Sequence, residues 1–362
     1  MKKSIVMILM LILTILLSIS CSTKKNTSSS IIKERVLNKN SNIKIKSGNL
    51  STDYSIDNAL NDINTFNLNT ISIPVIVDIS ALSSDDMNIN KASEEKTINL
   101  IKRLKGQNIS IILEPYPWID NGNLYETDWK PNNINTFFYN WKNKVLKRLI
   151  DNVANPYDVD AMIIASNFVH MESDEKNWCD TIEYVRQYYK GLVTYRTCWW
   201  HTASWDKDSL NLYKTKLNNK LFSKIDFISV AAYFELTNNN TNSVDNLVKS
   251  ISSTERYNRK QNIKQELKNF NTKWNKPIFF GELGFPRRNG ASIEPWNPNP
   301  SNIENDIEQA NCFEAYRQVF ENQSWLMGFS IFAIGDKSID KNYYPSDASK
   351  KIINKWYKSS EN

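Results

Sequence analysis

From residue 43 to the end of the chain, short apolar runs alternate with longer amphipathic stretches. Buried parallel strands are near-continuous apolar runs, whereas surface helices repeat apolar residues every three to four positions. The pattern predicts strands at residues 43–46, 70–77, 110–114, 160–165, 192–195, 227–232, 278–282 and 328–332. It predicts helices at 56–66, 92–104, 134–153, 174–189, 209–221, 244–274 with a break, 302–321 and 348–357. Eight strands, each followed by a helix, predict an α/β fold, a single closed (β/α)₈ TIM barrel.

The first 42 residues have a different pattern. Lys2 and Lys3 precede an apolar run over residues 5–17, which is shorter than the ~20 residues of a membrane-spanning helix. Small residues then lead to Cys21, as in a bacterial lipoprotein leader. We therefore expect residues 1–20 to be a signal peptide, Cys21 to be lipidated, and the protein to be anchored outside the cytoplasm on the bacterial membrane. An ordinary secretory leader with an incidental cysteine is the alternative.

Composition defines the remaining organisation. Residues 21–42 are rich in Ser, Thr, Lys and Asn and predict a flexible tether, so residues 43–362 form the barrel domain. The net charge of +6 is small and dispersed, which argues against nucleic acid as a partner. Cys179, Cys198 and Cys312 have no C-x-x-C spacing and predict buried thiols. The chain has only two histidines, so we expect no metal site. We also expect no cofactor and a monomeric protein.

The ends of the predicted strands carry the candidate chemistry. Glu282 ends the seventh strand and is followed by Gly284, and barrel enzymes keep their reactive groups at this end of their strands. The structural alternative is that Glu282 caps the next element or pairs with Arg287. Flat aromatic faces and polar groups together suit sugar rings, so we expect a polysaccharide or oligosaccharide partner. The other residues at these ends are Glu114, Trp118, Asn167, Tyr195, Trp199, Tyr233 and Phe332.

Several short motifs, in order and spacing, resemble glycoside hydrolase family 113. They include Ala165-Ser166-Asn167, Ala232-Tyr233-Phe234, Gly281-Glu282-Leu283-Gly284 and Gln309-Ala310. That family belongs to the clan of retaining (β/α)₈ glycosidases, clan A, and its known members are β-mannanases. The resemblance implies a β-linked glycan as substrate and Glu282 as the nucleophile that forms a glycosyl-enzyme. It also implies that Tyr233 hydrogen-bonds this nucleophile.

Asn167 departs from the family pattern. The family places its acid/base glutamate at the end of a Gly-Thr-Glu or Gly-Ser-Glu motif after the fourth strand, and an asparagine amide has no proton to give near pH 7. Three interpretations follow: Glu172 or Glu114 supplies the proton, the barrel binds a glycan without cleaving it, or it acts only on glycosides with good leaving groups. A lipoprotein that uses the barrel as a scaffold for protein interaction is the alternative from another class.

Overall fold

The computed structural model describes residue 37, residues 43–336 and residues 342–357. The predicted signal peptide, Cys21 and almost all of the predicted tether lie outside the described residues. Within the described ranges, no helix combines the length and apolar character needed to cross a membrane.

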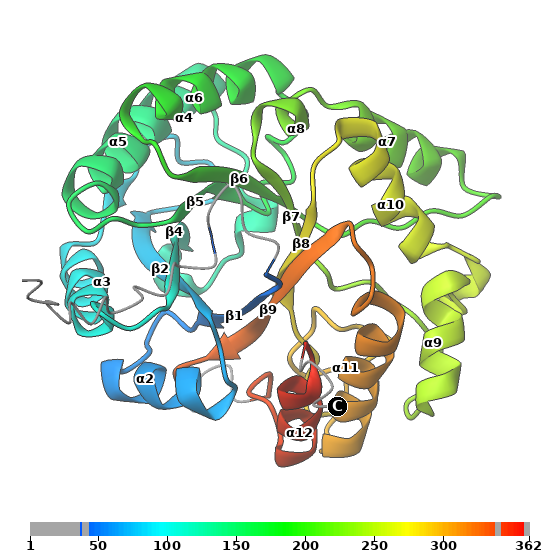
Figure 1. Cartoon of the computed structure of the whole chain (residues 1–362). Helices are drawn as coiled ribbons and strands as arrows, with labels where there is room; N and C mark the ends of the chain where they lie inside the picture. Colours follow the sequence, from blue (N-terminus) through cyan, green and yellow to red (C-terminus); the bar gives the residue numbers. More distant parts are fainter. Residues whose placement is uncertain (1–36, 38–42, 337–341, 358–362) are drawn as a thin grey trace, which may run out of the picture. The chain divides into compact units, whose positions relative to one another are not determined.

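The described chain forms a barrel of parallel strands surrounded by helices (Figure 1). β1 pairs in parallel with β2 on one side and with β9 on the other, and these pairings close the ring. In the described part of the chain, eight parallel strands form this ring, as the sequence predicts: β1 (Ile45–Leu50), β2 (Thr70–Ile79), β4 (Ser110–Ile119), β5 (Ala161–Ser166), β6 (Leu192–Thr197), β7 (Phe227–Ala231), β8 (Ile278–Leu283) and β9 (Leu326–Ile334).

A short extra strand, β3 (Asn88–Ile89), lies outside the predicted pattern. It pairs antiparallel with β2, Val77 opposite Ile89 and Asp78 opposite Asn88. Only two residues long, β3 is too short to show the alternation from which strands are recognised in sequence. It lies alongside the last residues of β2, close to the carboxyl end of that strand.

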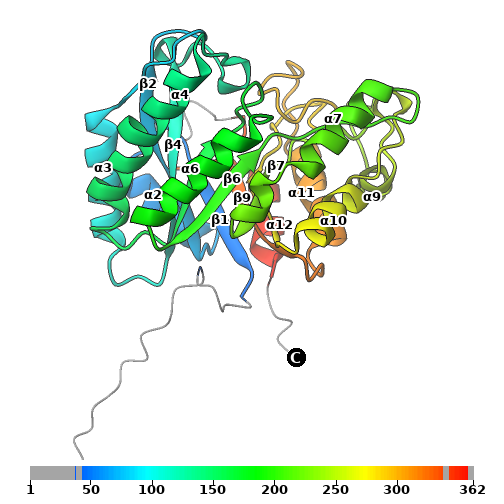
Figure 2. The same cartoon turned by 90° about the horizontal axis from the view of Figure 1, so that it is seen from above.

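The helices form the outer layer. They are α2 (Ile56–Thr65), α3 (Lys91–Leu104), α4 (Ile134–Asn140), α5 (Lys147–Leu149), α6 (Glu175–Tyr188), α7 (Lys207–Asn218), α8 (Leu221–Lys224), α9 (Val244–Ser252), α10 (Ile263–Trp274), α11 (Asp306–Phe320) and α12 (Asp347–Lys355). Figure 2 shows α3, α4 and α6 on one side of the barrel and α7, α9 and α10 on the other. The break predicted within residues 244–274 lies between α9 and α10. After α4 the chain stays helical to Ala154, through a π-helical segment, α5 and a second π-helical segment.

Capping side chains fix where many of these helices begin. Ser55 Oγ accepts a hydrogen bond from Asn58 N at the start of α2, and Asn90 Oδ1 does the same for Ser93 N at the start of α3. These bonds satisfy backbone amides that have no partner within the helix. All three cysteines are free thiols, and Cys198 and Cys312 are buried as predicted, whereas Cys179 is half-buried.

The barrel interior changes character along its axis. One end is filled by a cluster of apolar side chains, and Phe227 stacks edge to face on Phe279 there at 5.8 Å. Farther toward the carboxyl ends of the strands, the inward positions become polar and charged, including Asn49, Glu114 and Arg196. Apolar side chains in layers of this kind fill the interior of a barrel and form its packed core. The polar layer above them forms the floor of the candidate site.

Candidate active site

Arg196 of β6 is the centre of a buried charged cluster. Its side chain is 2% exposed, and a single guanidinium nitrogen, Nη1, lies 2.6 Å from Glu282 Oε1 and 2.7 Å from Glu114 Oε1. The same nitrogen lies 3.2 Å from Ser166 Oγ. A buried charge is costly unless it is paired and hydrogen-bonded. The cluster therefore holds one carboxylate from β4 and one from β8 at the same end of the barrel.

Glu282 reaches this cluster because the end of β8 is irregular. The pairing of β8 with β9 shifts register between Phe280 and Leu283, which breaks the strict alternation of side chains along a strand. Gly281 lies so close to Arg196 that an added Cβ would be 2.8 Å from Arg196 Nε. The glycine thus makes room for the guanidinium, and the next residue presents its carboxylate to it.

Tyr233, just after β7, lies beside the Glu282 carboxylate. The pKa of Tyr233 lies well above its usual value. Burial is the largest cause, and the negative charge of Glu282 and a hydrogen bond to that carboxylate add to it. The phenol is therefore a neutral hydrogen-bond donor at any ordinary pH. Such a donor stabilises the charged form of the carboxylate that accepts its bond.

Glu114 occupies the floor of the site. It is 4% exposed, and Ser72 Oγ donates to its Oε2 over 3.5 Å while Arg196 holds its Oε1. Burial raises the pKa of Glu114, Arg196 opposes that rise, and the negative charge of Glu282 adds to it. Since its contacts point into the barrel, Glu114 acts as a counter-ion within the polar layer.

Asn167 and Glu126 complete the cluster from above. Asn167 is 5% exposed, and its Nδ2 donates both to Glu126 Oε1 at 3.1 Å and to Glu282 Oε1 at 3.4 Å. Its Oδ1 is buried without a hydrogen-bond partner. Glu126 begins the short 3₁₀ turn Glu126–Asp128 in the loop after β4. Burial first, and then the charge of Glu282, raise the pKa of Glu126 to about 7.

The sequence of this barrel matches a known protein family. The sequence model of Glycoside Hydrolase Family 113 matches residues 42–355. The chain belongs to glycoside hydrolase family 113. Its match covers the whole described barrel, from before β1 to the end of α12. No curated protein matches this family 113 sequence.

Solved structures share the fold of this family 113 chain at low sequence identity. A family 113 β-1,4-mannanase is 18% identical with a TM-score of 0.65, over 87% of this chain and 99% of that one. The family 113 β-mannanase AaManA from Alicyclobacillus acidocaldarius is 14% identical with a TM-score of 0.67, over 86% and 96% of the two chains. A β-glucuronidase from an uncultured Clostridium species is 15% identical with a TM-score of 0.54, over 87% of this chain and 50% of its own.

Glu172, predicted as a substitute acid in the family 113 chain, lies in a different network. Its Oε1 binds Lys216 Nζ, and its Oε2 accepts a hydrogen bond from Thr197 Oγ1 at 2.6 Å. Asn219 Nδ2 donates to its backbone carbonyl at 2.8 Å. Both carboxylate oxygens are thus engaged between β6 and α7. Glu172 links these elements, and no hydrogen bond between described residues joins it to Glu282.

Aromatic side chains from three strand ends form one wall of the family 113 site. Trp199 contacts Tyr233 edge to face at 5.6 Å, and Tyr233 contacts Phe332 in the same way at 6.0 Å. Trp199 also stacks on Trp296 with centroids 6.4 Å apart and an interplanar angle of 14°. Trp296 comes from the long loop after β8 and is 43% exposed. The wall therefore extends from beside Glu282 to the surface.

Two other predicted aromatics have different surroundings. Tyr195 is fully buried and packs edge to face on Trp178 of α6 at 5.2 Å, because it alternates with Arg196 and points toward the helices. Trp118, near the end of β4, lies 6.5 Å from Tyr116 and covers the backbone of Gly122. Tyr195 therefore belongs to the core, while Trp118 packs against the loop that carries Glu126.

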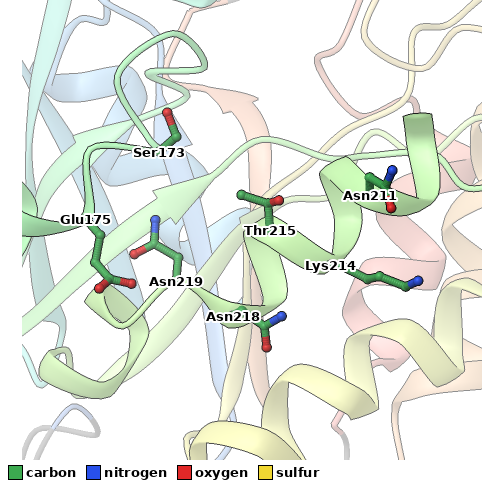
Figure 3. Close-up of a pocket in the computed structure, with 7 residues that line it drawn as sticks. All are labelled: Ser173, Glu175, Asn211, Lys214, Thr215, Asn218 and Asn219. Carbon is green, nitrogen blue, oxygen red and sulfur yellow. The ribbon is translucent and has the colours of Figure 1, made fainter. Parts of the chain in front are cut away.

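A depression of about 470 Å³ lies elsewhere on the described surface (Figure 3). Figure 3 shows Asn211, Lys214 and Thr215 on α7, and Ser173 and Glu175 on a separate segment that also lines the depression. The depression shares no residue with the carboxylate cluster. Its lining is polar and comes mostly from the exposed face of α7, which is typical of a solvated surface groove.

Proposed function

We propose that this barrel is a retaining glycoside hydrolase that cleaves a β-linked glycan, with Glu282 as the nucleophile. The contact between Arg196 Nη1 and Glu282 Oε1 carries the proposal, because a buried guanidinium favours the ionised carboxylate that a nucleophile requires. Tyr233 supports the same charge state. The two hold the carboxylate at the end of the seventh barrel strand, where (β/α)₈ enzymes carry their reactive groups.

The lining of the site supports a sugar ligand. Trp199 and Phe332 are half-buried aromatic residues beside Tyr233, and the C–H face of a pyranose ring can pack against such flat rings. Asn167 Oδ1 is a buried acceptor without a partner, and a sugar hydroxyl would satisfy it. The similar family 113 structures are β-mannanases, so we infer that β-1,4-linked manno-oligosaccharides are the first substrates to test.

Covalent labelling tests the nucleophile directly. A 2-deoxy-2-fluoro-β-mannosyl fluoride is expected to inactivate the protein and to leave one glycosyl group on the peptide that contains Glu282, located by mass spectrometry. E282Q should lose turnover of aryl β-mannosides, while E304Q, at a side chain that is 76% exposed, should keep it. Turnover that persists in E282Q would refute the assigned nucleophile.

A catalytically impaired glycan-binding lipoprotein is the second candidate, and the presence of Asn167 favours it. An amide cannot perform the proton transfer that the family pattern assigns to this position. Calorimetric binding of manno-oligosaccharides by the wild-type chain, without turnover and without covalent labelling, would establish this alternative.

We further propose that lipid on Cys21 anchors the protein outside the cytoplasm. The leader composition and the small residues before Cys21 support this proposal. Expressed with its leader in a bacterium, the wild-type chain should partition into the detergent phase and incorporate labelled fatty acid, and C21S should do neither. Equal partitioning of C21S would refute the anchor.

A further inference from the structure

We propose that Glu126, from the loop after β4, is the general acid and base of this barrel and replaces the glutamate that is absent at Asn167. This role rests on the proposed function, because it needs Glu282 as its partner nucleophile. Glu126 would transfer the proton from the loop after β4, beside the position where the family carries its acid.

The hydrogen bonds of Asn167 carry the argument. One nitrogen, Nδ2, donates to Glu126 Oε1 at 3.1 Å and to Glu282 Oε1 at 3.4 Å. The two carboxylate oxygens cannot lie farther apart than these two bond lengths together. An approach this close is compatible with the separation of about 5 to 5.5 Å between the two carboxyl groups of retaining glycosidases.

The loop holds Glu126 in place through Trp129. Trp129 N donates to Glu126 O at 3.2 Å, and the fully buried indole of Trp129 packs on Phe168 with centroids 5.2 Å apart. Its Nε1 donates to Ser84 O at 2.8 Å. Phe168 follows Asn167 directly, so the turn with Glu126 and the strand end with Asn167 share one anchor. A rigid support of this kind is what a catalytic carboxylate requires.

The competing carboxylates are committed to other partners. Glu114 is held by Arg196 on the floor of the site, and Glu172 by Lys216 and Thr197 between β6 and α7. Glu126 differs from both, since no Lys or Arg in the described part of the chain forms an ion pair with it. A half-buried carboxyl next to an ionised one and without a cation favours its protonated form.

The protonation state fits the role. Burial and the charge of Glu282 raise the pKa of Glu126 to about 7, while the hydrogen bond from Asn167 opposes the rise. A general acid works best when its pKa lies near the operating pH. Once Glu282 has been glycosylated, its charge is gone and the pKa of Glu126 falls, which converts the acid into the base of the second step.

Cleavage takes place in two steps, formation of the glycosyl-enzyme and its hydrolysis. A Glu282 carboxylate oxygen bonds to the anomeric carbon, the glycosidic C–O bond breaks, and the leaving oxygen takes its electron pair and the Glu126 proton. Glu126, now a carboxylate, removes a proton from water as the water oxygen attacks the anomeric carbon. The ester bond to Glu282 breaks, and both carboxyl groups return to their starting states. One water is consumed for each bond cleaved.

Leaving-group dependence tests the assignment. E126A should lose about 10² to 10⁴ in kcat/KM on manno-oligosaccharides, which need protonation, and little on 2,4-dinitrophenyl β-mannoside, which does not. Azide should restore kcat on the activated substrate and give β-mannosyl azide. D128N, a carboxyl change in the same 3₁₀ turn at an exposed position, should match the wild type in both assays.

The outcomes separate the two proposals. Loss of all turnover in E282Q, with E126A unchanged on manno-oligosaccharides, overturns the role of Glu126 alone. Turnover indifferent to E282Q overturns the proposed function and the role together. If E126A does not fold, carboxyl ¹³C NMR of the wild-type chain and of E282Q provides the test. One glutamate of the wild-type chain should titrate near pH 7, and its titration should move to lower pH in E282Q. If no glutamate titrates near pH 7, or if its titration does not move, the role of Glu126 is overturned.

Discussion

Replacing Arg196 by Met removes the cation at the centre of the carboxylate cluster. The guanidinium is 2% exposed and contacts Glu114 at 2.7 Å and Glu282 at 2.6 Å, so R196M leaves two buried carboxylates without their partner. Breaking a buried ion pair by removing one partner costs about 3 to 5 kcal/mol. For a barrel of about 300 residues, the unfolding entropy converts this loss to a fall in Tm of roughly 5 to 8 °C.

The loss should depend on pH in a defined direction. Burial and the charge of Glu282 already raise the pKa of Glu114, and removal of the opposing guanidinium raises it further. A carboxyl whose folded pKa exceeds its unfolded value stabilises the fold below the unfolded pKa, and this contribution is lost as the pH rises through the folded pKa. R196M should therefore be least stable relative to the wild type at pH 8 and closest to it near pH 5.

Calorimetric melting of both proteins between pH 5 and pH 8 measures this effect. R103M is the matched control, because Arg103 lies 3.5 Å from Asp57 with side chains 59% and 89% exposed. An exposed pair contributes at most about 1 kcal/mol, so R103M should melt within about 2 °C of the wild type at every pH. If R196M behaves like R103M at pH 8, or if its deficit does not shrink on acidification, the ion-pair reasoning is wrong.

Three further predictions concern the site and its support. Because the raised pKa of Glu126 is about 7, kcat/KM on manno-oligosaccharides should fall as pH rises through 7, and E126Q should lack this limb of the profile. W199A should raise KM for oligosaccharides roughly three- to tenfold with kcat on aryl mannosides unchanged, whereas W205A, at a tryptophan that is 64% exposed, should change neither. G281A should destabilise the barrel by about 1 to 3 kcal/mol in chemical unfolding, because its Cβ would lie 2.0 Å from Ser229 Oγ, and adding S229A should recover part of the loss.

The fold could be predicted because its signals are local. Each barrel strand is an apolar run between turn residues, and each is followed by an amphipathic segment, so count and order suffice for a closed barrel. The short strand β3 and the π-helical segments at Trp141–Leu146 and Ile150–Ala154 could not be predicted. They depend on pairing and packing with distant residues, which no local pattern records.

The candidate site was only partly accessible from the sequence. Glu282 lies near the end of a strand, which predicts the end of the barrel at which it lies, whereas its contact with Arg196 depends on the register shift in β8. Arg196 had a signal that was overlooked, since an arginine inside a buried strand must find carboxylates. Side chains alternate along β6, so Tyr195, the neighbour of Arg196, points toward the helices. Glu126 had no such signal: it lies in a loop, and only the packing of Trp129 on Phe168 brings it to Asn167.

The choice of Glu172 as a substitute acid relied on closeness in sequence. It stands five residues after Asn167, but the segment between them leads its side chain to Lys216 and Thr197. Glu126 is 41 residues away from Asn167 and is nevertheless within hydrogen-bonding distance. In a barrel, neighbouring strand ends are joined through space, so distance along the chain is a poor guide to which loops meet.

Asn167 has a left-handed backbone, with φ at 59°. Asparagine adopts this conformation several times more readily than most residues with a side chain, and for a typical L-residue it costs about 1 to 2 kcal/mol. Glutamate is not among the residues enriched in this conformation, so a glutamate substituted at position 167 would meet this cost. Restoring the customary acid at this position therefore requires the backbone to change as well as the side chain.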